Sequence, residues 1–187
     1  MKSIIIFASG SGSNAENIIK YFHNNNLAKV VLVLTNKKDA KVIDRCNDLN
    51  VSSLYFNKHA FKQGVVLNIL KQYNPDIIVL AGFLLKIPET IVKAFPNRII
   101  NIHPALLPKY GGKGMYGMHV HNAVVENKET VSGITIHYVN EHYDEGNIIF
   151  QATTSVEDND TPERVAEKIH DLEYQYFPIT IAKLLED

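Results

Sequence analysis

Two side chains that can support acyl chemistry stand two residues apart in this sequence, Asn101 and His103. They end an apolar, β-branched run, and the two-residue period of a strand puts both on one face. An amide and an imidazolium can donate hydrogen bonds to the oxyanion of a tetrahedral intermediate. Asp144, in a predicted turn, would favour the protonated imidazole and could relay a proton from an attacking amine. Together the three predict a formyl-transfer site that needs no covalent nucleophile.

Each of these residues also has an ordinary structural explanation. An asparagine and a histidine at a strand end can satisfy one another by hydrogen bonding, and an aspartate two residues before Gly146 is common in turns. The catalytic interpretation therefore requires that the three side chains converge in space.

A second candidate site is the first loop (residues 9–14), which follows the first predicted strand and opens the first predicted helix. Its glycines, Gly10 and Gly12, let the backbone approach a ligand, and the N–H groups at a helix start attract anions. Ser13 followed by Glu16 predicts a capping box at this helix start. A tight turn without a ligand is the plainer alternative, but the pattern favours phosphate binding.

The same glycines, with Ala15 as the third small residue, also fit the dinucleotide fingerprint. That fingerprint needs an acidic residue about 20 positions later, at the tip of the second strand. Here the second predicted strand ends in Leu34-Thr35-Asn36, without a carboxylate. NAD binding is therefore excluded, and a monophosphate fits the loop better.

Alternating strand and helix patterns position these loops. Short apolar runs predict strands covered on both faces, at residues 2–8, 30–35, 52–56, 76–81 and 98–102. Amphipathic stretches predict the intervening helices, at residues 14–25, 40–50, 60–73 and 89–95. Such alternation implies right-handed βαβ units, in which ligands bind at the carboxyl ends of the strands.

The pattern changes in the last third of the chain. Residues 131–139 and 147–155 predict two strands with a short connection, an antiparallel pair. A long helix follows, with Asp160 as its cap, Pro162 in its first turn and Glu163 as the capping-box partner. The predicted fold is α/β, with a doubly wound, mostly parallel sheet, an antiparallel strand pair near the C-terminus and a long C-terminal helix.

The composition limits the kinds of molecule that the protein is expected to bind. The chain has 187 residues, with 19 Lys and Arg against 20 Asp and Glu, so no basic surface for nucleic acid or an anionic membrane is expected. No apolar run approaches the ~20 residues of a membrane span. The only cysteine, Cys46, excludes an internal disulfide and is expected to be a buried, inert thiol. The sequence predicts one cytoplasmic domain over residues 1–187.

Five motifs together resemble a known enzyme family. They are SGSGSN (9–14), VLAGF (79–83), NIHPALLPKY (101–110), SGITIHYV (132–139) and the Asp144-x-Gly146 turn. In this order, and with NIHPALLPKY as the most specific, they resemble the phosphoribosylglycinamide formyltransferases of purine synthesis over essentially the whole chain. The resemblance implies the formyltransferase fold. It also implies transfer of a formyl group from 10-formyltetrahydrofolate to glycinamide ribonucleotide, giving formylglycinamide ribonucleotide and tetrahydrofolate.

The resemblance also implies roles for individual positions. The implied catalytic trio is Asn101, His103 and Asp144, with His103 as the proton donor. The implied contacts to the ribonucleotide are Gly12, Ser13, Asn14 and Glu173. The implied folate contacts are Leu84, Leu85, Lys86, Ile87, Asn140, Glu141, His142, Tyr143 and Asp144. The long loop (residues 111–117), which contains four glycines, is longer than is usual in the family.

Several alternatives stay open at this stage. His119 and His121 could suggest a metal pair, but two histidines do not complete a site, and no metal is predicted. His137 either faces the predicted cleft or is a buried, hydrogen-bonded histidine. The protein could be a monomer or a homodimer. The alternative functions are another formyl-folate enzyme of the same fold (a formyl-folate hydrolase or a tRNA formyltransferase-like enzyme) and a non-catalytic phosphate-binding module.

Overall fold

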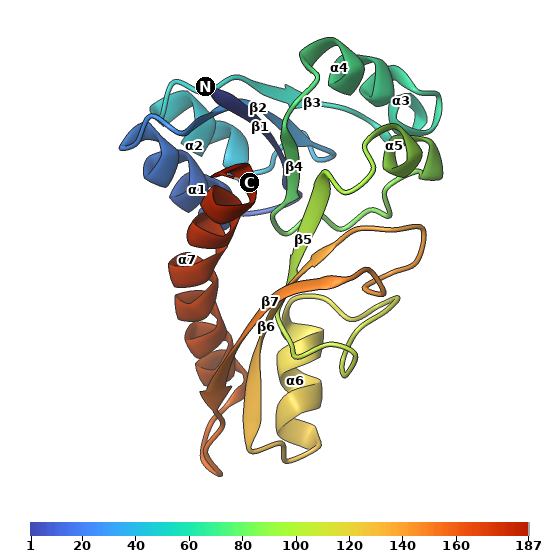
Figure 1. The fold of residues 1–187 in the computed structure, drawn as a ribbon. Helices are drawn as coiled ribbons and strands as arrows, with labels where there is room; N and C mark the ends of the chain where they lie inside the picture. The colour runs from blue at the N-terminus through green and yellow to red at the C-terminus, as the bar shows by residue number, and fades with distance from the viewer. Residues whose placement is uncertain (187) are drawn as a thin grey trace.

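A computed structural model describes residues 1–186 and shows a seven-stranded sheet in the order β3-β2-β1-β4-β5-β6-β7 (Figure 1). The strands are β1 (Lys2–Phe7), β2 (Ala28–Thr35), β3 (Ser53–Tyr55), β4 (Ile77–Leu80), β5 (Ile99–His103), β6 (Val131–Tyr138) and β7 (Ile148–Ser155). Strands β1 to β5 pair in parallel, whereas β6 is antiparallel to both β5 and β7. The predicted fold class is confirmed.

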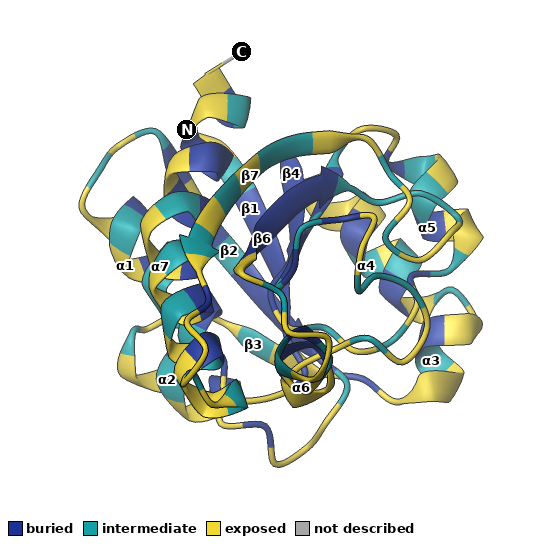
Figure 2. Cartoon of the chain, turned by 90° about the horizontal axis from the view of Figure 1, so that it is seen from below, coloured by how far each residue is buried: buried dark blue, intermediate teal, exposed yellow. Residues whose placement is uncertain are grey.

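Helices cover both faces of the sheet (Figure 2). They are α1 (Ser13–His23), α2 (Val42–Asp48), α3 (Lys58–Lys62), α4 (Val65–Tyr73), α5 (Glu89–Ala94), α6 (Met118–Glu126) and α7 (Pro162–Glu186). Alternation along β1 divides the core: Ile4 and Ile6 pack with α1, α2 and α7, whereas Ile5 and Phe7 pack with α4 and α5. All four side chains are fully buried, which explains why this strand is a continuous apolar run.

The middle of the chain differs from the prediction at two places. The single helix expected over residues 60–73 is divided into α3 and α4 by Gly64, which has a φ of 82°. Because that left-handed conformation suits glycine, the chain turns there although the apolar pattern continues. Helix α3 is capped by Asn57, whose side chain accepts a hydrogen bond from the Ala60 N–H at 2.8 Å. Helix α6 was not predicted at all.

The predicted N-caps also differ from the observed ones. Helix α1 is preceded by Gly12, in the left-handed conformation, and Ser13 is its first residue rather than its cap. At α7 the hydroxyl of Thr161, not Asp160, accepts a hydrogen bond from the backbone N–H of Arg164 at 3.3 Å. Asp160 instead forms an ion pair with the Lys168 ammonium. Both helices therefore start about where the sequence predicts, but with different capping groups.

The environment of Cys46 and the character of the helices also bear on the predictions. Cys46 is fully buried, and this burial raises the pKa of its thiol to about 11, so it is an unreactive core residue as predicted. None of the helices within residues 1–186 combines the length and the apolar character that crossing a bilayer requires.

Candidate active site

A cavity of about 730 Å³ opens beyond the carboxyl ends of β1, β4 and β5. Its walls come from segments that are far apart in the sequence: the first loop, residues 80–87, the end of β5, the long loop and the connection between β6 and β7. Helix α7 closes one side with Ile169, His170 and Glu173. The cavity lies where ligands of open parallel sheets bind.

The predicted trio converges at one wall of this cavity. Asn101 and His103 lie opposite His137 and Thr135 in the antiparallel pairing of β5 with β6. The Nδ1 atom of His103 is 3.7 Å from Asp144 Oδ2, and His137 Nε2 is 3.6 Å from Asp144 Oδ1. Asn101 Nδ2 lies 3.2 Å from His137 Nε2. His137 is thus a fourth member, and it is both buried and directed at the cleft, which settles the open question of its orientation.

The two histidines have defined tautomers in their neutral forms. His103 Nε2 lies 2.7 Å from the carbonyl oxygen of Tyr110, and His137 Nδ1 lies 2.9 Å from that of Tyr138. A carbonyl can only accept, so each of these nitrogens carries the proton. His103 Nδ1 is then the basic nitrogen and faces Asp144. His137 Nε2 lies between the Asn101 amide and the Asp144 carboxylate, and since only one of the two amide N–H groups of Asn101 can face it, the other stays free for a substrate oxygen.

Burial and nearby charges act in opposite directions on the pKa values of Asp144 and His103. Burial raises the pKa of Asp144, but contacts with His137, His103 and the Gly112 N–H outweigh it, and the net pKa is lowered. Burial lowers the pKa of His103 more than Asp144 and the Tyr110 carbonyl raise it. Burial of His103 therefore opposes the protonated imidazole that the sequence led us to expect, whereas the Asp144 carboxylate favours it.

The first loop forms another part of the cavity wall. Hydrogen bonding in α1 starts with the Glu16 N–H donating to the Gly12 carbonyl, so the N–H groups of residues 13–15 have no acceptor within the helix. Gly12 has a φ of 72°, and a Cβ there would collide with Val42 of α2. The glycine is therefore required by helix packing as well as by any ligand. Arg45 braces the loop by donating from Nε to the Ser11 carbonyl at 2.7 Å.

Helix α7 contributes two polar residues beside this loop. Glu173 is only 6% exposed and accepts hydrogen bonds from Asn14 Nδ2 at 2.8 Å and from His170 Nδ1 at 3.0 Å. The hydrogen bond to Glu173 raises the pKa of His170. Asn14 Oδ1 is buried without a hydrogen-bond partner among the described residues. Sequence analysis missed His170, although its position one helical turn before Glu173 is the pattern that would have identified it.

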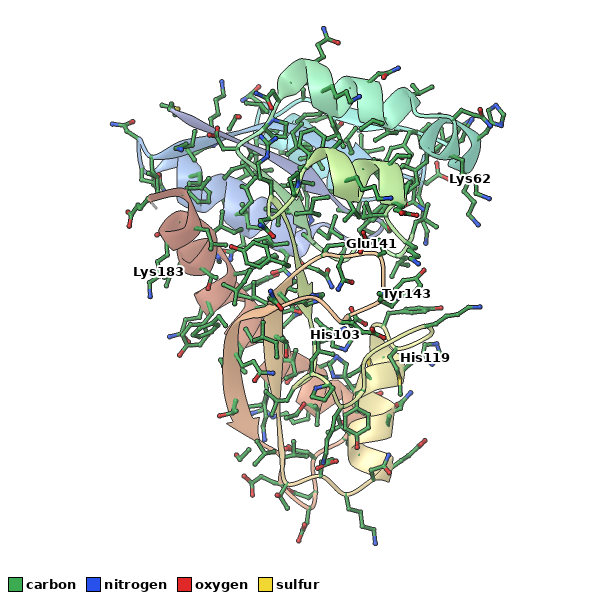
Figure 3. The ribbon with its side chains drawn as sticks, turned by 45° about the vertical axis from the view of Figure 1, so that its right-hand side comes forward. Lys62, His103, His119, Glu141, Tyr143 and Lys183 are labelled. Atoms are coloured by element: carbon green, nitrogen blue, oxygen red, sulfur yellow. The ribbon has the colours of Figure 1, made fainter. Side chains whose placement is uncertain are left out.

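The predicted folate segments border the same cavity. Residues 84–87 and Asn140, His142, Tyr143 and Asp144 line it, whereas Glu141 does not. Figure 3 shows Glu141 and Tyr143 on the connection between β6 and β7. The Leu84 N–H donates to the hydroxyl of Ser9 at 3.0 Å, which joins this segment to the first loop.

The two neighbouring histidines of α6 do not act together. His121 is 5% exposed and lines the cavity, with Nδ1 unpartnered among the described residues and a pKa that is lowered by burial. His119 is exposed, stacks edge-on against Tyr116 and lies at the edge of the molecule (Figure 3). Within residues 1–186, no group of three or more potential metal ligands occurs.

Comparisons with known proteins identify the family that this chain resembles. The sequence profile described as "Formyl transferase" matches residues 2–181. A phosphoribosylglycinamide formyltransferase of Bacillus subtilis is 37% identical over 99% of this chain and 95% of its own. A chloroplastic one of Arabidopsis thaliana is 39% identical over 100% of this chain, which spans 66% of that relative. The crystal structure of phosphoribosylglycinamide formyltransferase from Bacillus halodurans has a TM-score of 0.90 and 36% identity, covering 98% of this chain and 95% of that one.

Proposed function

This chain belongs to the formyl transferase family, and we propose that it transfers the formyl group of 10-formyltetrahydrofolate to the amine of glycinamide ribonucleotide in purine biosynthesis. The products are formylglycinamide ribonucleotide and tetrahydrofolate. The observation that carries the proposal is that Asn101, His103 and Asp144 meet at one cavity that the first loop also lines.

The ribonucleotide fits the end formed by the first loop and α7. The N–H groups of residues 13–15 and the dipole of α1 favour its phosphate. Glu173 offers a buried carboxylate to the hydroxyl or amine hydrogens of the same substrate, and Asn14 orients that carboxylate. Asn14 Oδ1, which has no partner in the described residues, is a further acceptor at this end.

The folate fits the slot between residues 84–87 and the β6–β7 connection. Leu84, Leu85 and Ile87 give this slot an apolar wall, and Asn140 to Asp144 offer backbone and side-chain polar groups opposite it. An apolar slot with a few placed polar groups suits a flat heteroaromatic ring. The formyl carbon then lies between the trio and the ribonucleotide amine.

The protonation states suggest the order of proton transfers. The neutral amine attacks the formyl carbon, a C–N bond forms, and the carbonyl electron pair moves to oxygen, where the free amide N–H of Asn101 stabilises the charge. His103 Nδ1 accepts the proton that leaves the amine, and Asp144 stabilises the imidazolium. As the bond from carbon to N10 of the folate breaks, His103 returns this proton to N10.

We further propose that residues 1–187 act as one cytoplasmic formyltransferase domain, as a monomer or a homodimer, without a metal cofactor. The match of the family over residues 2–181 supports the domain assignment. The mechanism requires no Lewis acid, because an amide donor and a histidine–aspartate pair provide the oxyanion stabilisation and the proton transfer.

A comparison of acceptors tests this function. The purified protein is incubated with 10-formyltetrahydrofolate and, separately, with glycinamide ribonucleotide, methionyl-tRNA or water alone, and products are identified by mass spectrometry. Formylated glycinamide ribonucleotide should accumulate, and the His103→Asn variant should form little of it. Release of formate without an acceptor, or formylation of methionyl-tRNA in preference, would refute the assignment.

A further inference from the structure

We propose that Tyr110 is a positioning residue: its phenol, anchored on Glu129, holds the backbone of residues 110–112 against both His103 and Asp144. The inference rests on the proposed function, because the positioned groups are its proton-transfer pair. Tyr110 itself does not line the large cavity, so it acts through the residues that do.

The backbone of residues 110–112 forms hydrogen bonds with two members of the trio. The Tyr110 carbonyl accepts the Nε2 proton of His103 at 2.7 Å, and the Gly112 N–H donates to Asp144 Oδ2 at 2.9 Å. Between them, a Cβ at Gly111 would lie 2.6 Å from Leu107 Cδ2 and 3.4 Å from Asp144 Cβ. The position of this short segment therefore determines the ring orientation of His103 and the placement of the carboxylate.

The segment needs an anchor because its conformation is unfavourable. Tyr110 has a φ of 55°, and a bulky L-residue pays an energetic penalty in the left-handed region. The phenol hydroxyl donates to Glu129 Oε1 at 2.9 Å, and Lys109 Nζ donates to the same oxygen at 2.9 Å. Burial and Glu129 raise the pKa of Tyr110, so its hydroxyl stays a donor.

Glu129 is itself held in place, between α6 and β6. Its backbone N–H donates to the Val124 carbonyl at 3.1 Å, and its pKa is lowered by hydrogen bonds from Lys109 and Tyr110. The anchor thus joins the catalytic segment to the end of α6. The Tyr110 ring packs in part against the hydrophobic core, but a second cavity, of about 250 Å³, also borders the Tyr110 and Glu129 side chains. Space for displacement of the ring is available once the hydrogen bond is lost.

The titration of His103 reports on this anchor without any substrate. The groups that influence the His103 charge are, besides the Tyr110 carbonyl, Asp144, His137 and Glu173. A Tyr110→Phe substitution changes none of these side chains and keeps the ring. When the carbonyl moves away, the imidazolium loses an acceptor, so the pKa of His103 should fall further.

The test measures the pKa of His103 by NMR in the wild-type protein and in Tyr110→Phe, with the signal assigned by its loss in His103→Asn. We expect a downward shift of about half to one pH unit in Tyr110→Phe. In formyl transfer, kcat should fall about tenfold while KM for both substrates stays within about twofold. Glu129→Gln, which keeps an acceptor oxygen, should retain most of the activity, whereas Glu129→Ala should resemble Tyr110→Phe. Tyr73→Phe, exposed on α4, is the matched control and should change nothing.

A wild-type pKa of His103 in folded Tyr110→Phe would overturn the positioning role, and so would a Glu129→Ala variant with a normal titration. This result is independent of the substrate assignment. If the wild-type protein formylates no glycinamide ribonucleotide but the titration shift is observed, the proposed function fails and the positioning role stands. Thermal unfolding of each variant shows whether it has kept its structure. If Tyr110→Phe has lost its structure, the comparison of Glu129→Gln with Glu129→Ala tests the positioning role instead.

Discussion

Replacing Asp144 by asparagine tests the electrostatic basis of the mechanism. The carboxylate lies 3.7 Å from His103 Nδ1, and both side chains are largely buried. At this separation and an effective dielectric constant of about 20, the attraction between two unit charges is about 4 kcal/mol, which corresponds to about 3 pH units. Because solvent and neighbouring dipoles compensate in part, a fall of about 1–3 units in the pKa of His103 is expected.

The consequence for catalysis follows from the proposed proton transfers. Without the carboxylate, His103 accepts the amine proton less readily, so kcat should fall by about 10²–10⁴. Asparagine keeps the size of the side chain, so KM for the ribonucleotide should change little. The assay measures kcat against pH in the wild-type and Asp144→Asn proteins, with His103 titration by NMR in parallel. Full turnover, or an unchanged titration of His103, would show that Asp144 has no part in the chemistry.

Three further predictions follow from the same structure. Asn101→Ala should lower kcat by about 10²–10³ without moving the pH profile, since an amide donor does not titrate; a shifted profile in steady-state kinetics would contradict this. Gly12→Val should collide with Val42 and weaken the fold, so thermal unfolding should occur earlier and both ligands should bind less well; a loss confined to the ribonucleotide would point to ligand contact alone. His103 and His121 have lowered pKa values in the folded state, so their contribution to stability is complete above about pH 6.5 and decreases as pH falls below it. Urea unfolding from pH 8 to 5 should show this decrease, and His121→Gln should reduce it.

The strands of the sheet could be predicted because each buried strand is an apolar run within a short stretch of sequence. A buried parallel strand such as residues 2–7 is apolar on both faces, and its continuous run of isoleucines is visible without any knowledge of its partners. Helix α6 was missed because its residues mix polar and apolar types around glycine-rich sequence and depend on packing against α7. The break at Gly64 was missed because the apolar pattern of α4 continues across it.

The site was predictable to the extent that side-chain types and spacing define it. Asn101 and His103 were identified by their shared strand face, and Asp144 by its place in a turn. The contributions of the Tyr110 carbonyl and the Gly112 N–H leave no mark in the sequence, because every residue has these groups. The lowered pKa of His103 could not be predicted, because burial is a property of the packed structure and acts against the nearby charge of Asp144.

The most direct test of formyl transfer follows the carbon atom itself. The protein is mixed with glycinamide ribonucleotide and 10-formyltetrahydrofolate that carries carbon-13 in the formyl group, and the label is observed by NMR. The proposed function predicts that the label moves into the formamide of the ribonucleotide, with an equal amount of tetrahydrofolate formed, and that His103→Asn abolishes most of this transfer. Label that stays on the folate, or that appears only as free formate, would contradict it.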